Sequence, residues 1–169
     1  MSPSPKASFA EMVLAMAAHI PGIDLDAVRT GLAMRHNVKE IQSAIHAHFA
    51  RYDLSPARFT VLVLLMHAQE EGLNPAELAE EVDVSRASMT GLLDVLEHAG
   101  LITRAQHPSD RRMVAIQITD KGRQTVLDML PDHFRRISRV VGQLTPDERR
   151  TLVSLMTKLA AGAAALRQD

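Results

Sequence analysis

The sequence predicts a mainly α-helical protein with one small β-hairpin, and three observations support this class. Apolar residues recur every three or four positions over most of the chain, which is the period of a helix face. Helix-start signals stand in front of several of these segments. One segment, "VAIQIT" at 114–119, instead alternates apolar and polar residues, which is typical of a half-buried strand.

Composition limits the class of protein. Of the 169 residues, 46% are hydrophobic, 23% are charged and only 3% are aromatic, so we expect a core of aliphatic residues and methionine. Cysteine is absent, which excludes disulfides and thiolate zinc sites and fits the cytoplasmic location that we expect. The run "FTVLVLLM" at 59–66 is too short to cross a membrane, and the N-terminal residues do not resemble a signal peptide.

The helix starts are marked by repeated capping signals. "SFAE" at 8–11, "NPAE" at 74–77 and "TPDE" at 145–148 each place a capping side chain three residues before a glutamate, which is the capping-box arrangement. Gly31 is a candidate bend or interruption of the second helix, and Pro131 should kink or break the sixth. The predicted helices cover 8–19, 25–52, 56–70, 75–82, 86–98, 120–141 and 146–166.

The centre of the chain predicts a winged helix-turn-helix. Two short helices joined by "VDV" at 82–84 are followed by two strands, 101–106 and 113–118, which are separated by the turn "HPSDRR". The fold class is therefore a winged helix-turn-helix domain at 53–119 plus a terminal-helix dimerisation domain at 25–52 and 120–169. Residues 1–24 form an N-terminal extension with an extra helix.

A winged helix-turn-helix can bind double-stranded DNA. A helix of this size fits the major groove, and a basic loop beside it can reach the neighbouring minor groove, whose negative potential attracts arginine. The net charge of −1 argues against a nonspecific polyanion binder, but residues 85–123 contain six Lys or Arg against four acids.

The chain resembles the MarR family of bacterial transcriptional regulators. The matching segments are "LSPARFTVLVLL", "PAELAEEVDVSRASMTGLLDVLEHAGLITR" and "DRRMVAIQITDKG". The resemblance implies a homodimer that binds a pseudo-palindromic operator and responds to a small-molecule effector, often an aromatic acid or phenol. The peroxide-sensing branch of the family needs a cysteine, and the urate-responsive branch uses an N-terminal tryptophan; this sequence contains neither residue type.

Nine residues are candidate DNA contacts. In the second helix of the pair, the polar N-terminal residues could touch base edges and phosphates, or could instead be a helix cap and a solvated face. In the wing, one arginine would enter the minor groove, for which we favour Arg111, while Arg112 would pair with Asp110 or with a phosphate to support the wing. The candidates are Ser85, Arg86, Ser88, Thr90, Arg111, Arg112, Asn74, Arg58 and Arg104.

Gly91 occupies a position in the second helix where many relatives carry arginine. It could allow close approach of the helix backbone to DNA, or it could be a packing accommodation. As a helix-interior glycine it costs up to ~1 kcal/mol relative to alanine. The same departure motivates an alternative function, that of a winged-helix interaction module without sequence-specific DNA binding.

The residues give less support for an effector pocket, a metal site or an enzyme. We expect an effector pocket between the helices at 25–52, 56–70 and 120–141, with His36, His48, Arg51 and Arg58 as possible anion partners. His46 and His48 lie about 200° apart on a helix and do not converge on one ion, so we expect no metal site and no cofactor. We find no nucleophile elbow, phosphate loop or paired metal ligands, and we therefore expect no enzyme.

Overall fold

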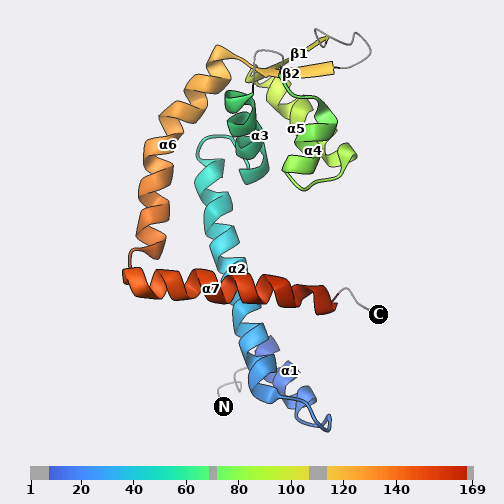
Figure 1. Cartoon of the computed structure of the whole chain (residues 1–169), viewed down its shortest axis with the longest axis vertical. Coiled ribbons are helices and arrows are strands. Elements are labelled where there is room, and N and C mark those ends of the chain that lie inside the picture. Colours follow the sequence, from blue (N-terminus) through green and yellow to red (C-terminus); the bar gives the residue numbers. More distant parts are fainter. Residues whose placement is uncertain (1–7, 69–71, 107–113, 167–169) are drawn as a thin grey trace, which may run out of the picture. The chain divides into compact units, whose positions relative to one another are not determined.

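The structure of the protein is a computed structural model that describes residues 8–68, 72–106 and 114–166. It divides into two compact units, Met1–Pro56 and Ala57–Asp169. Each unit is helical apart from one two-stranded antiparallel sheet in the second (Figure 1). No helix among the described residues combines the length and the apolar content that a membrane span requires.

The first unit is a pair of helices, α1 (Phe9–Ala17) and α2 (Leu25–Ala50). The predicted capping box opens α1, because the Ser8 amide donates to the Glu11 carboxylate at 2.6 Å and the Glu11 amide donates to the Ser8 hydroxyl at 3.2 Å. The two helices contact each other where the Arg35 guanidinium lies 4.4 Å from the centroid of the Phe9 ring. Helix α2 runs through Gly31 without interruption.

The second unit contains the remaining elements in the order that the sequence predicts. These are α3 (Pro56–His67), α4 (Pro75–Glu81), α5 (Arg86–His98), β1 (Ile102–Gln106), β2 (Val114–Ile118), α6 (Asp120–Val141), α7 (Pro146–Gly162) and a final 3₁₀ turn (Ala163–Leu166). Both other predicted capping boxes, Asn74 with Glu77 and Thr145 with Glu148, are present. The fold class is confirmed as mainly helical with a small β-wing.

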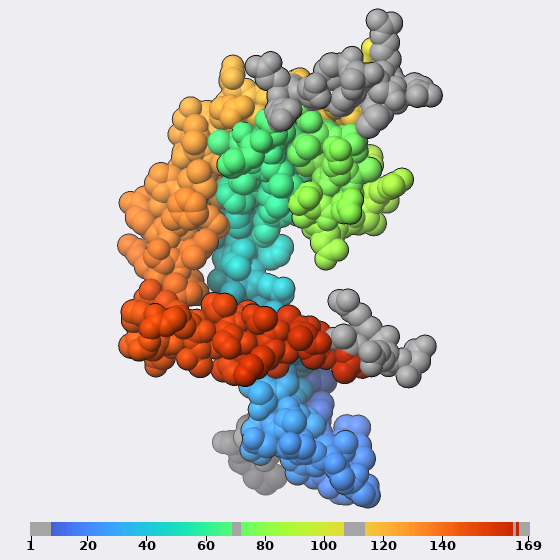
Figure 2. Space-filling model, viewed as in Figure 1, coloured from blue at the N-terminus to red at the C-terminus, as the bar shows by residue number. Residues whose placement is uncertain are grey.

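The core of the second unit is aliphatic and draws on α3, α4, α5, the hairpin and the first half of α6. Segments α3 to α5 form one continuous body in the space-filling view (Figure 2). Its fully buried large side chains are Val61, Leu62, Leu78, Met89, Leu93, Leu96, Ile102, Ile116, Val126 and Met129. This core fixes the orientation of α5, because one face of that helix contributes three of the buried side chains.

Leu73 pairs with the free edge of β2 and so extends the hairpin by one short segment. The Leu73 amide donates to the Ile116 carbonyl at 3.1 Å, and the Ile116 amide donates to the Leu73 carbonyl at 2.8 Å. The preceding residue, Gly72, has φ +77°, and a Cβ at this position would overlap the Ile116 carbonyl. A glycine is therefore needed to bring the entry of α4 against the sheet.

Of the two outcomes that the sequence predicts for Pro131, a kink or a break of α6, the break does not occur. Helix α6 runs from Asp120 to Val141 with Pro131 inside it. A proline removes one backbone hydrogen bond, whereas this helix has 22 residues and buries Val126 and Met129 just before the proline. Those anchors and the hydrogen bonds on both sides are sufficient to continue the helix.

Candidate nucleic-acid interface

Helices α4 and α5 form the helix-turn-helix. Asn74 caps α4 by accepting hydrogen bonds from the Ala76 and Glu77 amides at 2.9 and 3.0 Å. The link between the helices turns at Asp83, which has φ +55°, and the Val84 amide donates to the Ala79 carbonyl at 3.0 Å. The link is therefore a defined hydrogen-bonded turn rather than a loose connection.

Helix α5 is held by its buried face and by both of its ends. Met89, Leu93 and Leu96 are at most 1% exposed. At the C-terminus, Gly100 has φ +71°, its amide donates to the Glu97 carbonyl at 2.8 Å, and the Leu101 amide donates to the Leu96 carbonyl at 2.9 Å. These two bonds form a Schellman motif, which ends α5 close to the predicted bound at residue 98.

The four predicted contact residues of α5 are all exposed at its N-terminal end. Ser85 is confirmed as the helix cap, because its hydroxyl accepts from the Ser88 amide at 3.1 Å. The hydroxyls of Ser85 and Ser88 also share a hydrogen bond of 2.9 Å. The Thr90 hydroxyl donates to the Arg86 carbonyl at 3.1 Å, and its oxygen can still accept a hydrogen bond.

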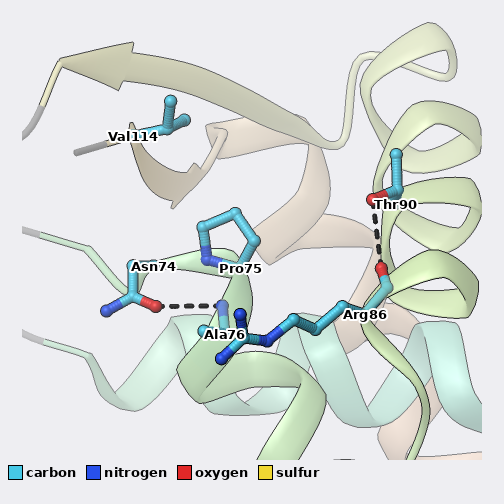
Figure 3. A pocket seen from close by; sticks show the side chains of 6 residues that line it. All are labelled: Asn74, Pro75, Ala76, Arg86, Thr90 and Val114. Atoms are coloured by element: carbon cyan, nitrogen blue, oxygen red, sulfur yellow. Dashed lines mark hydrogen bonds between the residues drawn. The ribbon is translucent and has the colours of Figure 1, made fainter. Parts of the chain in front are cut away.

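Three of the predicted residues from two elements meet at one surface depression, which we call the Arg86 hollow. It has a volume of about 330 Å³. Figure 3 shows the Arg86 side chain extending from α5 toward Ala76 and Asn74 at the start of α4. Its lining residues are Asn74, Pro75, Ala76, Arg86, Thr90 and Val114. Within the described parts of the chain, no acceptor pairs with the Arg86 guanidinium, and its side chain lines a depression that is otherwise mostly apolar.

Arg104 has a different environment from Arg86. It lies on β1 and bridges two carboxylates of α5, with 2.6 Å between its Nη2 and Asp94 Oδ1 and 3.0 Å between its Nη1 and Glu97 Oε2. The guanidinium thus fastens the hairpin to α5 and offsets two negative charges on that helix. Asp94 and Glu97 are partners that the sequence analysis did not identify, because the strand–helix pairing is not visible in the sequence.

The other predicted DNA contacts are not part of the Arg86 hollow. Arg58 is half-buried on α3. Arg111, Arg112 and Asp110, which form the predicted tip of the wing, lie outside the described residues. Their roles, and a phosphate contact of Arg104, stay predictions from the sequence.

A junction links the end of α5 to the start of α6, and the sequence analysis did not assign it a role. Thr119 caps α6 by accepting from the Gly122 amide at 3.0 Å, and its hydroxyl donates to the Gly100 carbonyl at 2.8 Å. The Lys121 ammonium donates to the Ala99 carbonyl at 2.7 Å. A Cβ on Gly122 would overlap the Leu101 carbonyl. The segment "TDKG" therefore fastens α6 directly to the C-terminus of α5.

Three of the four predicted effector residues lie in or directly after α2, and the fourth, Arg58, lies on α3. His36 and Arg51 are exposed, whereas His48 is half-buried with its ring 5.6 Å from that of Tyr52. Among the described residues, no group of three or more His, Asp or Glu side chains is placed to hold a metal ion. His133 packs 5.3 Å from the Phe59 ring, and desolvation lowers its pKa while Asp132 raises it less strongly.

The geometry defines a winged helix-turn-helix with an exposed, capped second helix, and comparison with known proteins narrows the class further. A model of the MarR family matches residues 54–114. The chain is 32% identical over 137 residues to the transcriptional repressor YetL of Bacillus subtilis, covering 81% of this chain and 82% of that one.

Solved structures agree with this result. The transcriptional repressor CouR bound to a 23-mer DNA duplex is 32% identical, covers 77% of this chain and 91% of that chain, and superposes with a TM-score of 0.67. Bordetella bronchiseptica BpsR, whose DNA binding is regulated by 6-hydroxynicotinic acid, has the same fold at 24% identity and a TM-score of 0.66, covering 77% and 91% of the two chains. The chain belongs to the MarR family of transcriptional regulators.

Proposed function

We propose that this protein is a homodimeric repressor that binds a pseudo-palindromic DNA operator through α5 and the wing and is released by a small aromatic or phenolic effector. The observation that carries the proposal is the exposed N-terminal half of α5. Its capping and contact side chains face solvent, its opposite face is locked in the core, and the Arg86 guanidinium has no protein acceptor in the described residues.

Electrostatics on α5 support a contact with DNA. Arg104 offsets the charge of Asp94 and Glu97, so the helix presents little net negative charge toward a phosphate backbone. Arg86 can then donate two hydrogen bonds to guanine or one to a phosphate, while Ser85, Ser88 and Thr90 contribute smaller polar contacts. Asn74, Arg58 and the wing residues Arg111 and Arg112 complete the proposed surface.

The distribution of exposed apolar side chains supports a homodimer. Among the described residues, 21 large hydrophobic side chains are exposed; ten lie between Phe9 and Ile45, nine lie on α6 and α7, and only Val95 and Val114 lie elsewhere. Faces of this extent are usually covered by a partner, and a second copy covers them in the proposed assembly. We therefore assign dimerisation to 25–52 and 120–169 and DNA binding to 53–119.

The proposals of repression and of release by an effector are supported by the proteins that this chain resembles. Two relatives at 32% identity are named repressors, and BpsR shows that a protein of this fold can respond to a small aromatic acid. His36, His48 and Arg51 are the residues that we propose for an anionic effector. Because a transcriptional regulator must reach the chromosome, we place the protein in the cytoplasm.

Among single substitutions, replacing Arg86 by alanine is the most direct test of the proposed DNA binding. Fluorescence anisotropy with labelled duplexes from the flanks of its own gene should show specific binding for the unaltered protein. Arg86→Ala should weaken it by about 30-fold or more, because a bidentate arginine–guanine pair contributes about 1–3 kcal/mol and the homodimer loses two such pairs. Binding to unrelated DNA should fall much less.

Lys39→Ala is the matched control, since it also removes one positive charge but lies on the exposed surface of α2 in the other unit. It should leave operator affinity unchanged. Equal affinities for Arg86→Ala and Lys39→Ala, or no specific shift for any flanking duplex, would contradict the proposal. The second of these results would favour a winged-helix interaction module that does not read DNA.

A further inference from the structure

In the N-terminal half of α5, the two most outward positions carry almost no side chain. A helix turns about 100° per residue, so Ala87 and Gly91, each two residues from the buried Met89, lie about 160° around the helix from it. Both positions are exposed. The polar residues Arg86 and Thr90 stand on one flank of these two positions, toward the Arg86 hollow.

Packing within the chain does not require a glycine at position 91. A Cβ built there meets no atom within 4 Å, in contrast to Gly122, where a Cβ would overlap a backbone carbonyl. Glycine destabilises a helix interior relative to alanine, so Gly91 weakens α5 without any compensating contact inside the described chain. The bare backbone at this point leaves room for a group from outside the chain to approach α5 closely.

The exposed side chain of Val95 on the same face of α5 is explained neither by the core nor by the proposed dimer. Val95 is 48% exposed and, with Val114, is one of only two exposed large hydrophobic residues between α3 and β2 in the described part of the chain. Val95 lies four residues after Gly91, and Gly91 lies four residues after Ala87, so the three positions follow one another along the helix. Ala87, Gly91 and Val95 thus form one apolar row along the exposed face of α5, without a hydrogen-bonding side chain.

The charged groups beside this row do not prevent approach to DNA. Asp94, which is the nearest carboxylate in sequence, is held by Arg104 at 2.6 Å, and Glu97 is held by the same guanidinium at 3.0 Å. The row can therefore enter a groove whose walls are negatively charged. In the major groove, the only apolar group on a base edge is the C5-methyl of thymine.

We infer that the row Ala87–Gly91–Val95 determines sequence specificity by packing against thymine C5-methyl groups, with Gly91 as the point of closest approach. This inference rests on the proposed DNA-binding function and adds to it a preference for thymine that the Arg86 guanidinium does not supply. An added methyl group at position 91 occupies the space that the thymine methyl needs.

The test combines a change in the protein with a change in the DNA. The probe is the duplex that the full-length protein selects from a random-sequence library, with its thymines replaced one at a time by deoxyuridine, which lacks only the methyl group. For the unaltered protein, at least one replacement per half-site should weaken binding about fourfold, the factor that corresponds to burial of one methyl group.

Gly91→Ala should bind the unmodified selected duplex at least tenfold more weakly than the unaltered protein does. On a duplex with deoxyuridine at the responsive position of both half-sites, most of this loss should disappear, because each removed methyl group makes room for an alanine. The melting temperature of Gly91→Ala should be equal or higher, which excludes unfolding as the cause. Gly162→Ala is the matched control, since a Cβ there also meets nothing; its ratio of affinities for the thymine and deoxyuridine duplexes should equal that of the unaltered protein.

Three outcomes overturn the inference. If a duplex is selected but no deoxyuridine replacement weakens binding, thymine methyls are not read, although the proposed function stands. If Gly91→Ala loses the same affinity on thymine and deoxyuridine duplexes, or loses none, the close approach is wrong. If no duplex is selected at all, the proposed function fails and this inference fails with it.

Discussion

Arg86 and Arg104 show how the same side chain takes different roles in two environments. Arg86 begins α5, lines the Arg86 hollow and has no protein acceptor among the described residues. Arg104 is committed to two carboxylates of α5. Both residues are equivalent candidates in the sequence, because the proximity of β1 to α5 appears only after folding.

Replacing Arg104 by alanine should weaken operator binding even if Arg104 never touches DNA. The change leaves Asp94 and Glu97 without compensation near the phosphates, so we expect affinity to fall about three- to tenfold at low salt. The stability loss should stay below about 1 kcal/mol, because the ion pairs are partly exposed to solvent.

The triple variant Arg104→Ala, Asp94→Asn, Glu97→Gln separates the two roles of Arg104. If Arg104 acts by offsetting charge, neutral partners should restore most of the affinity measured by anisotropy. If affinity stays as low as in Arg104→Ala alone, Arg104 contacts a phosphate directly, as the sequence analysis considered.

At the scale of elements, local sequence signals predict most of the fold. All three capping boxes and the stop at Gly100 are present, because their hydrogen bonds join residues within one turn of each other. The break expected at Pro131 is absent because anchoring by Val126 and Met129 depends on tertiary packing. The junction at Thr119 and Lys121 is likewise formed between distant residues, so the sequence alone does not show it.

The capping box of α7 should make that helix sensitive to acid. Hydrogen bonds from the Thr145 backbone and side chain lower the pKa of Glu148 in the folded state. Its stabilising contribution is therefore present above the ordinary value of 4.5 and is lost as the pH falls through the lower pKa of the folded protein.

Thermal melts followed by circular dichroism can measure this effect. Glu148→Ala should melt at a lower temperature than the unaltered protein at pH 7, and the difference should shrink as the pH falls below 4.5 and through the lower pKa that Glu148 has in the folded protein. Asp147→Ala is a suitable control in the same turn, because Asp147 takes no part in the capping box. A difference that stays constant over this range would contradict the assigned role.

At the scale of the whole molecule, the exposed apolar faces of α1, α2, α6 and α7 are the main feature that one chain does not account for. The stripes are visible in the sequence, because they follow the helical period. What covers them is not visible there, since an amphipathic helix can pack within its own chain or against a partner. The same limit applies to the effector pocket, which depends on how separate helices come together.

The central claim is that two copies of this chain read two half-sites through two α5 helices. The most direct measurement is titration of the selected duplex with the protein, combined with light scattering of the free protein and of the complex. We predict a free dimer of twice 18.6 kDa and two chains per duplex. Inserting about five base pairs, half a helical turn, between the half-sites should abolish high-affinity binding. A free monomer, or a complex of one chain per duplex that tolerates the insertion, would contradict the claim.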